Sequence, residues 1–279
     1  MADVRNGVAV ITGAAGGLGG GLARVAAGRG MKLVLADRDE ARLTAVVDAL
    51  SAEGAEAIGV PTDVTDPAAL DRLAAKAKER FGAVTLLINN AGIETLGLSW
   101  ELPAETWQRA IGVNLLGVIY GVRAFAPGML AEGKPAHIVN IASLAALGMM
   151  PITAPYMVTK HAVLAFTECL KLEMDVKAAP ITVSAVLPGA IATPIFTDAP
   201  GVDGDPMVAA HRAIMGEMLA QGLSPDEAAD RIFAQLDEGR FWVSPHPEML
   251  AEMADDRAAY LSARSAPELR EGHRHMLAI

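Results

Sequence analysis

The sequence has very little cysteine and few aromatic residues. Cys169 is the one cysteine among 279 residues, so no internal disulfide can form, and a reducing compartment such as the cytoplasm is the expected location. Aromatic residues make up 4% of the chain, so a core must be built from aliphatic side chains and methionine. Hydrophobic residues nonetheless reach 52%, which excludes a disordered chain and suits one large α/β domain.

The sequence also has few positively charged residues and no long apolar run. Lys and Arg number 23 against 33 Asp and Glu, and the net charge of −10 argues against a nucleic-acid or anionic membrane surface. No apolar run approaches ~20 residues and no signal-peptide pattern opens the chain, so no membrane segment is expected. The six histidines show no ligand spacing beyond His273-x-His275, so no metal site is expected.

Short apolar runs alternate with amphipathic stretches along the chain. Strands are predicted at 7–12, 32–36, 55–61, 84–88, 136–142, 181–187 and 241–243, and helices at 20–29, 40–53, 67–81, 103–129, 154–178 and 249–262. This order predicts an α/β fold, a Rossmann-type doubly wound parallel sheet with helices on both faces, in one domain over 1–262. Residues 190–224 are predicted to be a substrate-covering insertion, with a plain surface loop as the alternative. Residues 263–279 form a C-terminal tail, either disordered or facing a partner.

A glycine-rich turn follows the first predicted strand directly. Gly13, Gly17 and Gly19 lie in Thr-Gly-x-x-x-Gly-x-Gly spacing, and a helical pattern comes next. Glycine lets backbone N–H groups approach a pyrophosphate, and a helix N-terminus adds partial positive charge. The order strand, turn, helix favours a dinucleotide site over a glycine loop that binds nothing.

An acidic residue, Asp37, ends the second predicted strand about 20 residues beyond the glycine turn, as in many dinucleotide sites. Its carboxylate can accept hydrogen bonds from the adenosine ribose and would repel a 2′-phosphate, which favours NAD over NADP. Arg38 weakens that preference, because an arginine can pair with such a phosphate. The alternative for Asp37 is an N-cap or a solvated acid ahead of the next helix.

The stretch 143–160 carries the clearest chemical signal. Ser143 closes an apolar strand, and Tyr156 and Lys160 stand at i and i+4 near the start of a helix, which puts the phenol and the ammonium on one face. A hydroxyl, a phenol and an ammonium together suit proton transfer. The spacing Tyr-x-x-x-Lys alone also occurs by chance. Asn114 lies in the middle of a predicted helix, and the alternative to a functional role is a buried amide whose hydrogen bonds are all made within the core.

Together these motifs resemble the short-chain dehydrogenase/reductase family over about residues 7–243. The resemblance rests on the glycine turn, Asp63-Val64, Asn89-Asn90-Ala91-Gly92, Asn114, Ser143, Tyr156-x-x-x-Lys160, Pro188-Gly189 and Thr193, in the family's order. It implies an oxidoreductase that interconverts a secondary alcohol and a ketone on a small molecule with NAD, or with NADP. It also implies a homodimer or homotetramer that associates through the long helices.

The resemblance implies a role for each matching residue. Tyr156 would be the general acid/base, and Lys160 would lower its pKa and hold the nicotinamide ribose. Ser143 would polarise the substrate oxygen, and Asn114 would hold a water that relays protons from the lysine to solvent. The residues implied at the cofactor are Gly13, Gly17, Leu18, Gly19, Asp37, Arg38, Asp63, Val64, Asn90, Ala91, Gly92, Tyr156, Lys160, Pro188, Gly189, Ile191 and Thr193.

The substrate pocket is predicted to be mostly apolar, which suits an apolar or aromatic alcohol or ketone. Its predicted residues are Ser143, Met149, Met150, Tyr156, Phe196 and Glu94. Glu94 is favoured as a solvated loop acid; if it faces the pocket instead, it would select a cationic or hydroxylated substrate. Two rival functions stay open: an NADPH-preferring 3-oxoacyl or carbonyl reductase, and a non-catalytic dinucleotide-binding regulator, which the intact set of four predicted catalytic residues disfavours.

Overall fold

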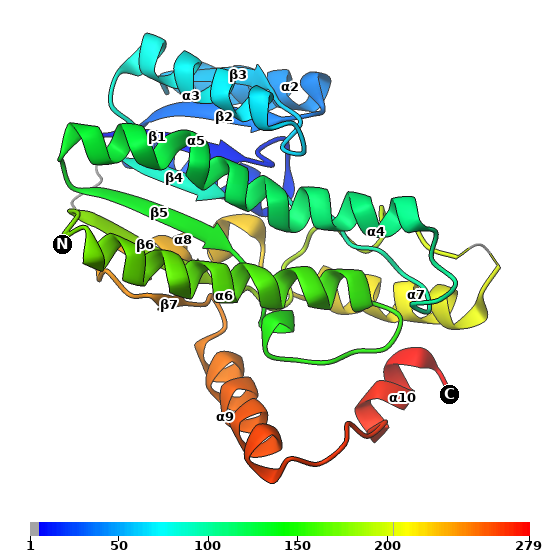
Figure 1. Cartoon of the computed structure of the whole chain (residues 1–279). Coiled ribbons are helices and arrows are strands. Elements are labelled where there is room, and N and C mark those ends of the chain that lie inside the picture. The colour runs from blue at the N-terminus through cyan, green and yellow to red at the C-terminus, as the bar shows by residue number, and fades with distance from the viewer. Residues whose placement is uncertain (1–5, 203) are drawn as a thin grey trace.

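The computed structural model of the protein describes residues 6–202 and 204–279. One sheet of seven parallel strands, in the order β3-β2-β1-β4-β5-β6-β7, has helices on both faces (Figure 1). The strands are β1 (Val8–Thr12), β2 (Lys32–Asp37), β3 (Ala57–Pro61), β4 (Leu86–Asn89), β5 (Ala136–Ile141), β6 (Ile181–Val186) and β7 (Trp242–Val243). The predicted Rossmann-type doubly wound fold is confirmed, and each predicted strand is present.

The helices predicted between residues 20 and 178 and at 249–262 are present, with the one predicted at 103–129 interrupted by a π-helical turn, and a further helix lies in the predicted insertion 190–224. The helices are α1 (Gly17–Gly28), α2 (Glu40–Ala52), α3 (Pro67–Phe81), α4 (Ala104–Ile111), α5 (Gly117–Glu132), α6 (Ala154–Val176), α7 (Pro206–Ala220), α8 (Pro225–Asp237), α9 (Pro247–Ala263) and α10 (Glu271–Leu277). Helix α8 was not predicted, although Ser224 and Glu227 form a capping box at its start and Pro225 occupies its first turn. The predicted tail contains α10, which packs against α7.

Alternate residues of the central strands face opposite helical layers. Ala9 and Ile11 of β1 join the core formed with α1, α2 and α8, whereas Val8 and Val10 join the core formed with α3, α5 and α6. Figure 1 shows α5 and α6 in front of the sheet and α8 behind it. A strand buried on both faces needs an apolar residue at nearly every position, which explains its continuous apolar sequence.

The stretch Ala104–Glu132 is long and apolar enough, by length and composition, to cross a membrane. It consists of α4, a π-helical turn over Gly112–Leu116, and α5. This differs from the expectation that no segment would qualify. Half of its most apolar window is buried, and Val122, Phe125 and Met129 pack in the core against the sheet, α3 and α6. Packing within the protein therefore accounts for its apolar composition.

A buried histidine, His137, lies at the amino end of β5. Its Nε2 is 2.8 Å from Ser184 Oγ on β6, and that hydroxyl donates to the Arg240 carbonyl oxygen. Because the serine proton is used there, Nε2 is the donor in the first bond. Burial lowers the pKa of His137 to about 4, and the charge of Asp237 acts in the opposite direction.

This histidine should make stability depend on pH. Its pKa is about 4 in the folded protein against 6.5 ordinarily, so the folded state binds fewer protons than the unfolded chain between these values. Its contribution is therefore complete above pH 6.5 and is lost as pH falls toward 4, by about 3 kcal/mol. Urea unfolding at neutral and mildly acidic pH should show a smaller acid loss for His137→Gln than for wild type. The exposed-site control His275→Gln should behave as wild type; equal losses in all three would contradict the assignment.

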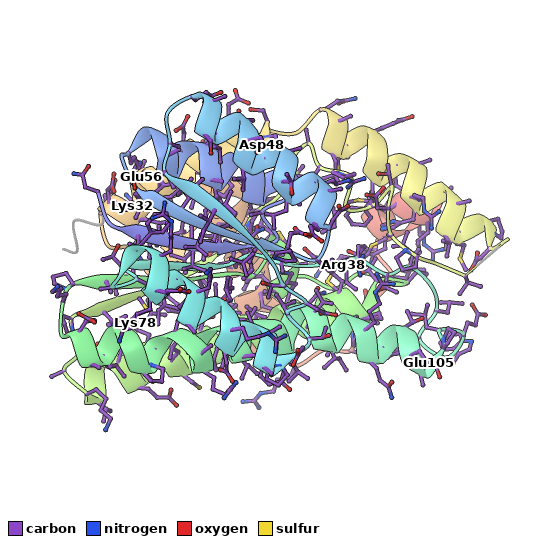
Figure 2. All side chains as sticks on the ribbon, turned by 90° about the horizontal axis from the view of Figure 1, so that it is seen from above. Lys32, Arg38, Asp48, Glu56, Lys78 and Glu105 are labelled. Carbon is purple, nitrogen blue, oxygen red and sulfur yellow. The ribbon has the colours of Figure 1, made fainter. Side chains whose placement is uncertain are left out.

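The carboxyl ends of the strands lie at one edge of the sheet, because all neighbouring strands are parallel. In Figure 2, Lys32 marks the amino end of β2, beside Glu56 of its ion pair, and Arg38 lies just past the opposite end. Helix α7 lies toward the carboxyl ends, with α10 beneath it (Figure 1). Ligands of open α/β sheets bind outside this edge, and the predicted site residues are found there.

Candidate functional site

The glycine turn between β1 and α1 is fixed to the end of β4. Asn90 donates from Nδ2 to the carbonyl oxygens of Thr12 (2.9 Å) and Gly13 (3.1 Å), and its backbone N–H donates to Thr12 Oγ1 (3.0 Å). Gly13 has a φ of +66°, and a Cβ at Gly19 would lie 2.1 Å from the Gly13 carbonyl oxygen. Both positions therefore require glycine.

The start of α1 suits an anionic group. Its N-cap, Gly16, has no side chain to cap the first N–H groups, and its first turn holds no acidic residue. Such a helix N-terminus has backbone donors and partial positive charge for a phosphate. Thr193, from the segment after β6, lies over Gly17, where a Cβ would be 3.2 Å from Thr193 Cγ2. These residues fit a dinucleotide pyrophosphate.

Asp37, at the end of β2, lies next to the glycine turn. Its Oδ2 accepts a hydrogen bond from the Ala15 N–H (3.1 Å), and its Oδ1 accepts one from the Asp39 N–H (3.0 Å). Asp39 is the N-cap of α2, so the N-cap alternative for Asp37 is wrong. Arg38 is exposed beside it. The Asp37 carboxylate thus holds the turn in place and still lies at the ligand edge of the sheet.

Asp63 and Val64 follow β3 at the same edge. Asp63 Oδ1 accepts hydrogen bonds from the backbone N–H (2.9 Å) and the hydroxyl (2.8 Å) of Thr65. Val64 is buried, and a Cβ at Gly117 of α5 would lie 2.9 Å from it.

Across residues 6–202 and 204–279, no group of three or more His, Cys, Asp or Glu is placed to hold a metal ion.

Helix α6 presents Tyr156 and Lys160 on one face, as the i,i+4 spacing predicts. Lys160 Nζ lies 5.5 Å from the centroid of the Tyr156 ring and donates to the Ile141 carbonyl oxygen (2.9 Å). The lysine is buried, with 3% of its surface exposed. Since Ile141 ends β5, this bond fixes the helix to the strand that leads into Ser143.

Ser143 reaches the same place from the end of β5. Its Oγ accepts a hydrogen bond from the Ala145 N–H (3.1 Å) and lies 3.5 Å from the Pro188 carbonyl oxygen. The Ser143 side chain also acts on the Tyr156 phenol and lowers its pKa. Gly189, directly after Pro188, donates its N–H to His246 Nδ1 (3.2 Å), so the segments after β6 and β7 meet beside the serine.

Asn114 lies in the π-helical turn between α4 and α5. Its Nδ2 donates to the Ile93 carbonyl oxygen (2.9 Å) and to Thr159 Oγ1 (3.1 Å), and its Oδ1 accepts from the Ile93 N–H (2.8 Å). A Cβ at Gly92 would lie 3.6 Å from both Asn114 Oδ1 and Lys160 Nζ. The side-chain amide of Asn114 thus makes its hydrogen bonds within the protein, as expected for a core residue. It also lies beside Lys160. One-turn π-helices recur at functional sites.

Burial dominates the electrostatics of the site. It raises the pKa of the Tyr156 phenol above its ordinary value; Glu94 raises it further, and the Ser143 side chain lowers it. Burial also lowers the pKa of Lys160 to about 8, against the opposite effect of Glu94. The lysine therefore remains mostly protonated at neutral pH, and its cation favours the phenolate that burial disfavours.

Glu94 is the clearest correction to the sequence predictions. Only 1% of its surface is exposed, so its preferred reading as a solvated loop acid is wrong. Its Oε1 accepts a hydrogen bond from the Thr95 N–H (2.9 Å), and its Oε2 has no hydrogen-bond partner among the described residues. Burial raises the pKa of Glu94 well above its ordinary value, while the Thr95 bond and Lys160 act in the opposite direction.

The predicted substrate residues separate into two environments. Met149 is exposed, whereas Met150 and Phe196 pack on an apolar cluster that we call the roof cluster. Its buried members are Leu96, Ile152, Ala199, Val208 and Leu277. Leu277, from α10, was not predicted here. Helix α10 is held against α7 by His211, whose Nδ1 lies 3.0 Å from the Met276 carbonyl oxygen.

Comparison with known proteins gives consistent findings. The sequence matches the family model described as short chain dehydrogenase over residues 7–200. It is 32% identical to a "CLA biosynthesis dehydrogenase/reductase" of Lactiplantibacillus plantarum, over 96% of this chain and 98% of that protein. It is 33% identical to a "1-deoxy-11-beta-hydroxypentalenate dehydrogenase" of Streptomyces avermitilis, over 88% and 87%. A short chain dehydrogenase/reductase from Burkholderia phymatum, solved with NAD, superposes with a TM-score of 0.90 at 38% identity, covering 96% and 98% of the two chains.

Proposed function

The chain belongs to the short-chain dehydrogenase family, and on that premise we propose that this oxidoreductase interconverts a secondary alcohol and a ketone with NAD as its preferred cofactor. The observation that carries the proposal is the convergence of Tyr156, Lys160 and Ser143 beside the glycine turn, at the carboxyl edge of the sheet. The nicotinamide, when bound, supplies or accepts the hydride. NAD(P)H absorbance with a panel of secondary alcohols and ketones tests the reaction class, and no turnover of any member would contradict it.

Tyr156 is proposed to move the proton at the substrate oxygen. A free phenol has a pKa near ~10, and burial raises that of Tyr156, so the phenolate needs a nearby cation. Lys160, buried and hydrogen-bonded to Ile141, holds such a cation 5.5 Å from the ring centroid. The phenol would protonate a ketone oxygen during reduction, and the phenolate would take the proton of an alcohol during oxidation.

Ser143 and Asn114 are proposed to support that proton transfer. The Ser143 side chain lies close enough to the phenol to lower its pKa, so a substrate oxygen between the two would receive a second hydrogen bond from the serine hydroxyl. Asn114 holds the backbone of Ile93 through two bonds and lies near Lys160. A water in contact with Asn114 and the lysine would connect the site to solvent.

The dinucleotide is proposed to lie along the carboxyl edge of the sheet. Gly13, Gly17 and Gly19 with the start of α1 would hold the pyrophosphate, and Asp37 the adenosine ribose. Asn90 keeps the turn shaped for this contact. The bound NAD of the Burkholderia phymatum relative supports the same cofactor for this chain.

Charge at Asp37 should set the choice between NAD and NADP. Asp37→Asn keeps an oxygen for the Ala15 N–H and removes the charge that repels a 2′-phosphate, while the exposed Arg38 can pair with that phosphate. We expect the ratio of kcat/KM for NAD to that for NADP to fall by about 10²-fold, since like-charge contact costs several kcal/mol. Asp48→Asn, the same change at an exposed position of α2, should leave the ratio unchanged (Figure 2). An unchanged ratio in Asp37→Asn would show that the acid does not select the cofactor.

The roof cluster and its neighbours Met150 and Phe196 support an apolar or aromatic body for the substrate. The stretch 190–224, with α7, is proposed to cover that body. We also propose that copies of the chain associate through α5 and α6, because Val158, Leu172 and Val176 leave large apolar side chains exposed on α6. A solution mass of 29.0 kDa, that of one chain, would contradict this association.

A further inference from the structure

One buried carboxyl oxygen close to the site in sequence has no partner among residues 6–202 and 204–279. Glu94 Oε2 is buried and makes no hydrogen bond among the described residues, although Oε1 of the same group accepts one from Thr95. Buried polar atoms are almost always paired in native proteins, and each exception calls for an explanation. The mechanism above uses Tyr156, Lys160, Ser143 and Asn114 and leaves this oxygen without a role.

The loop that carries Glu94 is held on two sides. Leu96 donates its N–H to the Pro200 carbonyl oxygen (2.9 Å) and accepts from the Val202 N–H (3.1 Å), while Gly97 donates to the Ile152 carbonyl oxygen (2.8 Å). These bonds join the loop after β4 to the loop before α6 and to the segment before α7. The backbone on the C-terminal side of Glu94 is therefore held in place, and Leu96 of the same loop belongs to the roof cluster.

Glu94 also lies near the proposed chemistry. It directly follows Ile93, which makes two hydrogen bonds with Asn114, and its loop is bonded to the Ile152 carbonyl oxygen, four residues before Tyr156. Its charge would raise the pKa of both Tyr156 and Lys160. The lysine ammonium donates to the Ile141 carbonyl oxygen, and no ion pair of Glu94 is present among the described residues. The acid is thus neither a surface charge nor half of a salt bridge; it is a buried polar group on a loop that is bonded to Asn114 and to the loop before α6.

We propose that Glu94 binds a second hydroxyl group of the substrate, so that the enzyme acts on diols and hydroxyketones with an apolar or aromatic body. A buried carboxyl group in its neutral form offers one O–H donor and one acceptor oxygen. A hydroxyl offers the same pair and can satisfy both. This inference rests on the proposed alcohol–ketone function and adds to it a substrate class and a specificity-determining residue.

The test compares substrates that differ in one hydroxyl. Hydrobenzoin and cyclohexanediol are each paired with the analogue that lacks the second hydroxyl, and kcat/KM is measured with NAD. Wild type should prefer the diols by about 10²-fold or more, because a site built to bond a hydroxyl rejects the analogue without it. Glu94→Leu should reduce this preference by about 10²-fold, and Glu94→Gln, which keeps a donor and an acceptor, should retain most of it. Glu101→Leu, the same change at an exposed acid nearby, should leave the preference unchanged.

Thermal unfolding separates this role from a structural one. A buried polar atom without a partner destabilises the fold, so Glu94→Leu should raise Tm, whereas loss of a structural contact would lower it. If Glu94→Leu does not fold, the preference of Glu94→Ala decides in its place. Lack of a diol preference in wild type, or an unchanged preference in these variants, would overturn the proposal. A Glu94-dependent preference for the matching amino alcohol would overturn it in favour of a cationic substrate.

The same assays distinguish failure of this inference from failure of the proposed function. Turnover of any panel alcohol that disappears in Tyr156→Phe supports the alcohol–ketone reaction, whatever happens at Glu94. If that reaction stands and the diol preference is absent, the role of Glu94 alone is refuted. If wild type oxidises or reduces no substrate with either cofactor, both are refuted.

Discussion

Tyr156→Phe should lower kcat by roughly 10²- to 10⁴-fold for every substrate, the range typical of losing a general acid/base. The change removes one oxygen from a ring that α6 and Lys160 hold in place, so the ring itself should remain where it is. The lysine would then have no phenolate to stabilise, and Ser143 alone would contact the substrate oxygen. NADH affinity should stay within about threefold of wild type, because the phenol contributes little to cofactor binding relative to the pyrophosphate site.

The matched control is Tyr120→Phe, the same change on the partly buried face of α5. It should leave kcat unchanged, and both variants should bind NADH in a fluorescence titration. Turnover by Tyr156→Phe at a rate near that of wild type would refute the proposed mechanism. If Tyr156→Phe lost NADH binding as well as activity, the tyrosine would be needed for the structure of the cofactor site. A role limited to proton transfer would then be contradicted.

Gly19→Ala should abolish cofactor binding at ordinary concentrations, with the NADH Kd raised by about 10²-fold or more, which corresponds to roughly 3 kcal/mol. A Cβ at this position would lie 2.1 Å from the Gly13 carbonyl oxygen and 2.7 Å from Asn90 Nδ2. Both neighbours belong to the arrangement that shapes the turn, and neither is the flexible end of a long side chain. The turn must therefore open, and the N–H groups at the start of α1 would then no longer be oriented to donate hydrogen bonds to the pyrophosphate.

Gly28→Ala, at the other end of the same helix, is the matched control, because a Cβ there meets no atom within 4 Å. It should bind NADH as wild type does and be slightly more stable, since alanine is the better helix former. Circular dichroism and unfolding curves would show whether Gly19→Ala remains folded. A folded variant that binds NADH normally would exclude the glycine turn as the cofactor site.

The parts of the fold that the sequence predicts are those fixed by local patterns. Strands buried on both faces leave apolar runs, as at Val8–Thr12, and the glycine turn and the i,i+4 spacing of Tyr156 and Lys160 are short-range signals. Helix α8 also had a local signal, the capping box of Ser224 and Glu227. It was missed because the stretch before it was interpreted as an irregular insertion.

The burial of Glu94 and the contribution of Leu277 could not be predicted in this way. The loop that carries Glu94 is bonded to the segments around Ile152 and Pro200, which lie far along the chain and meet this loop only in the folded protein. Leu277 reaches the roof cluster because α10 returns to pack on α7 after an exposed helix. No pattern within either segment encodes its distant partners, so both features depend on tertiary packing alone.

The π-helical turn at Gly112–Leu116 has a consequence for the periodicity of the chain. A π turn closes i→i+5 hydrogen bonds, so it adds about one residue relative to an α-helical turn. One extra residue corresponds to about 100° of rotation around the helix axis. A residue of α5 therefore lies about 100° away from the position that counting α-helical turns from α4 would give, although the two helices follow one another directly. The buried side of this long helical stretch is therefore out of phase between its two halves. A single 3.6-residue repeat cannot fit both halves, so the turn that carries Asn114 also hides the amphipathic pattern of α4 and α5 from a search for one continuous helix.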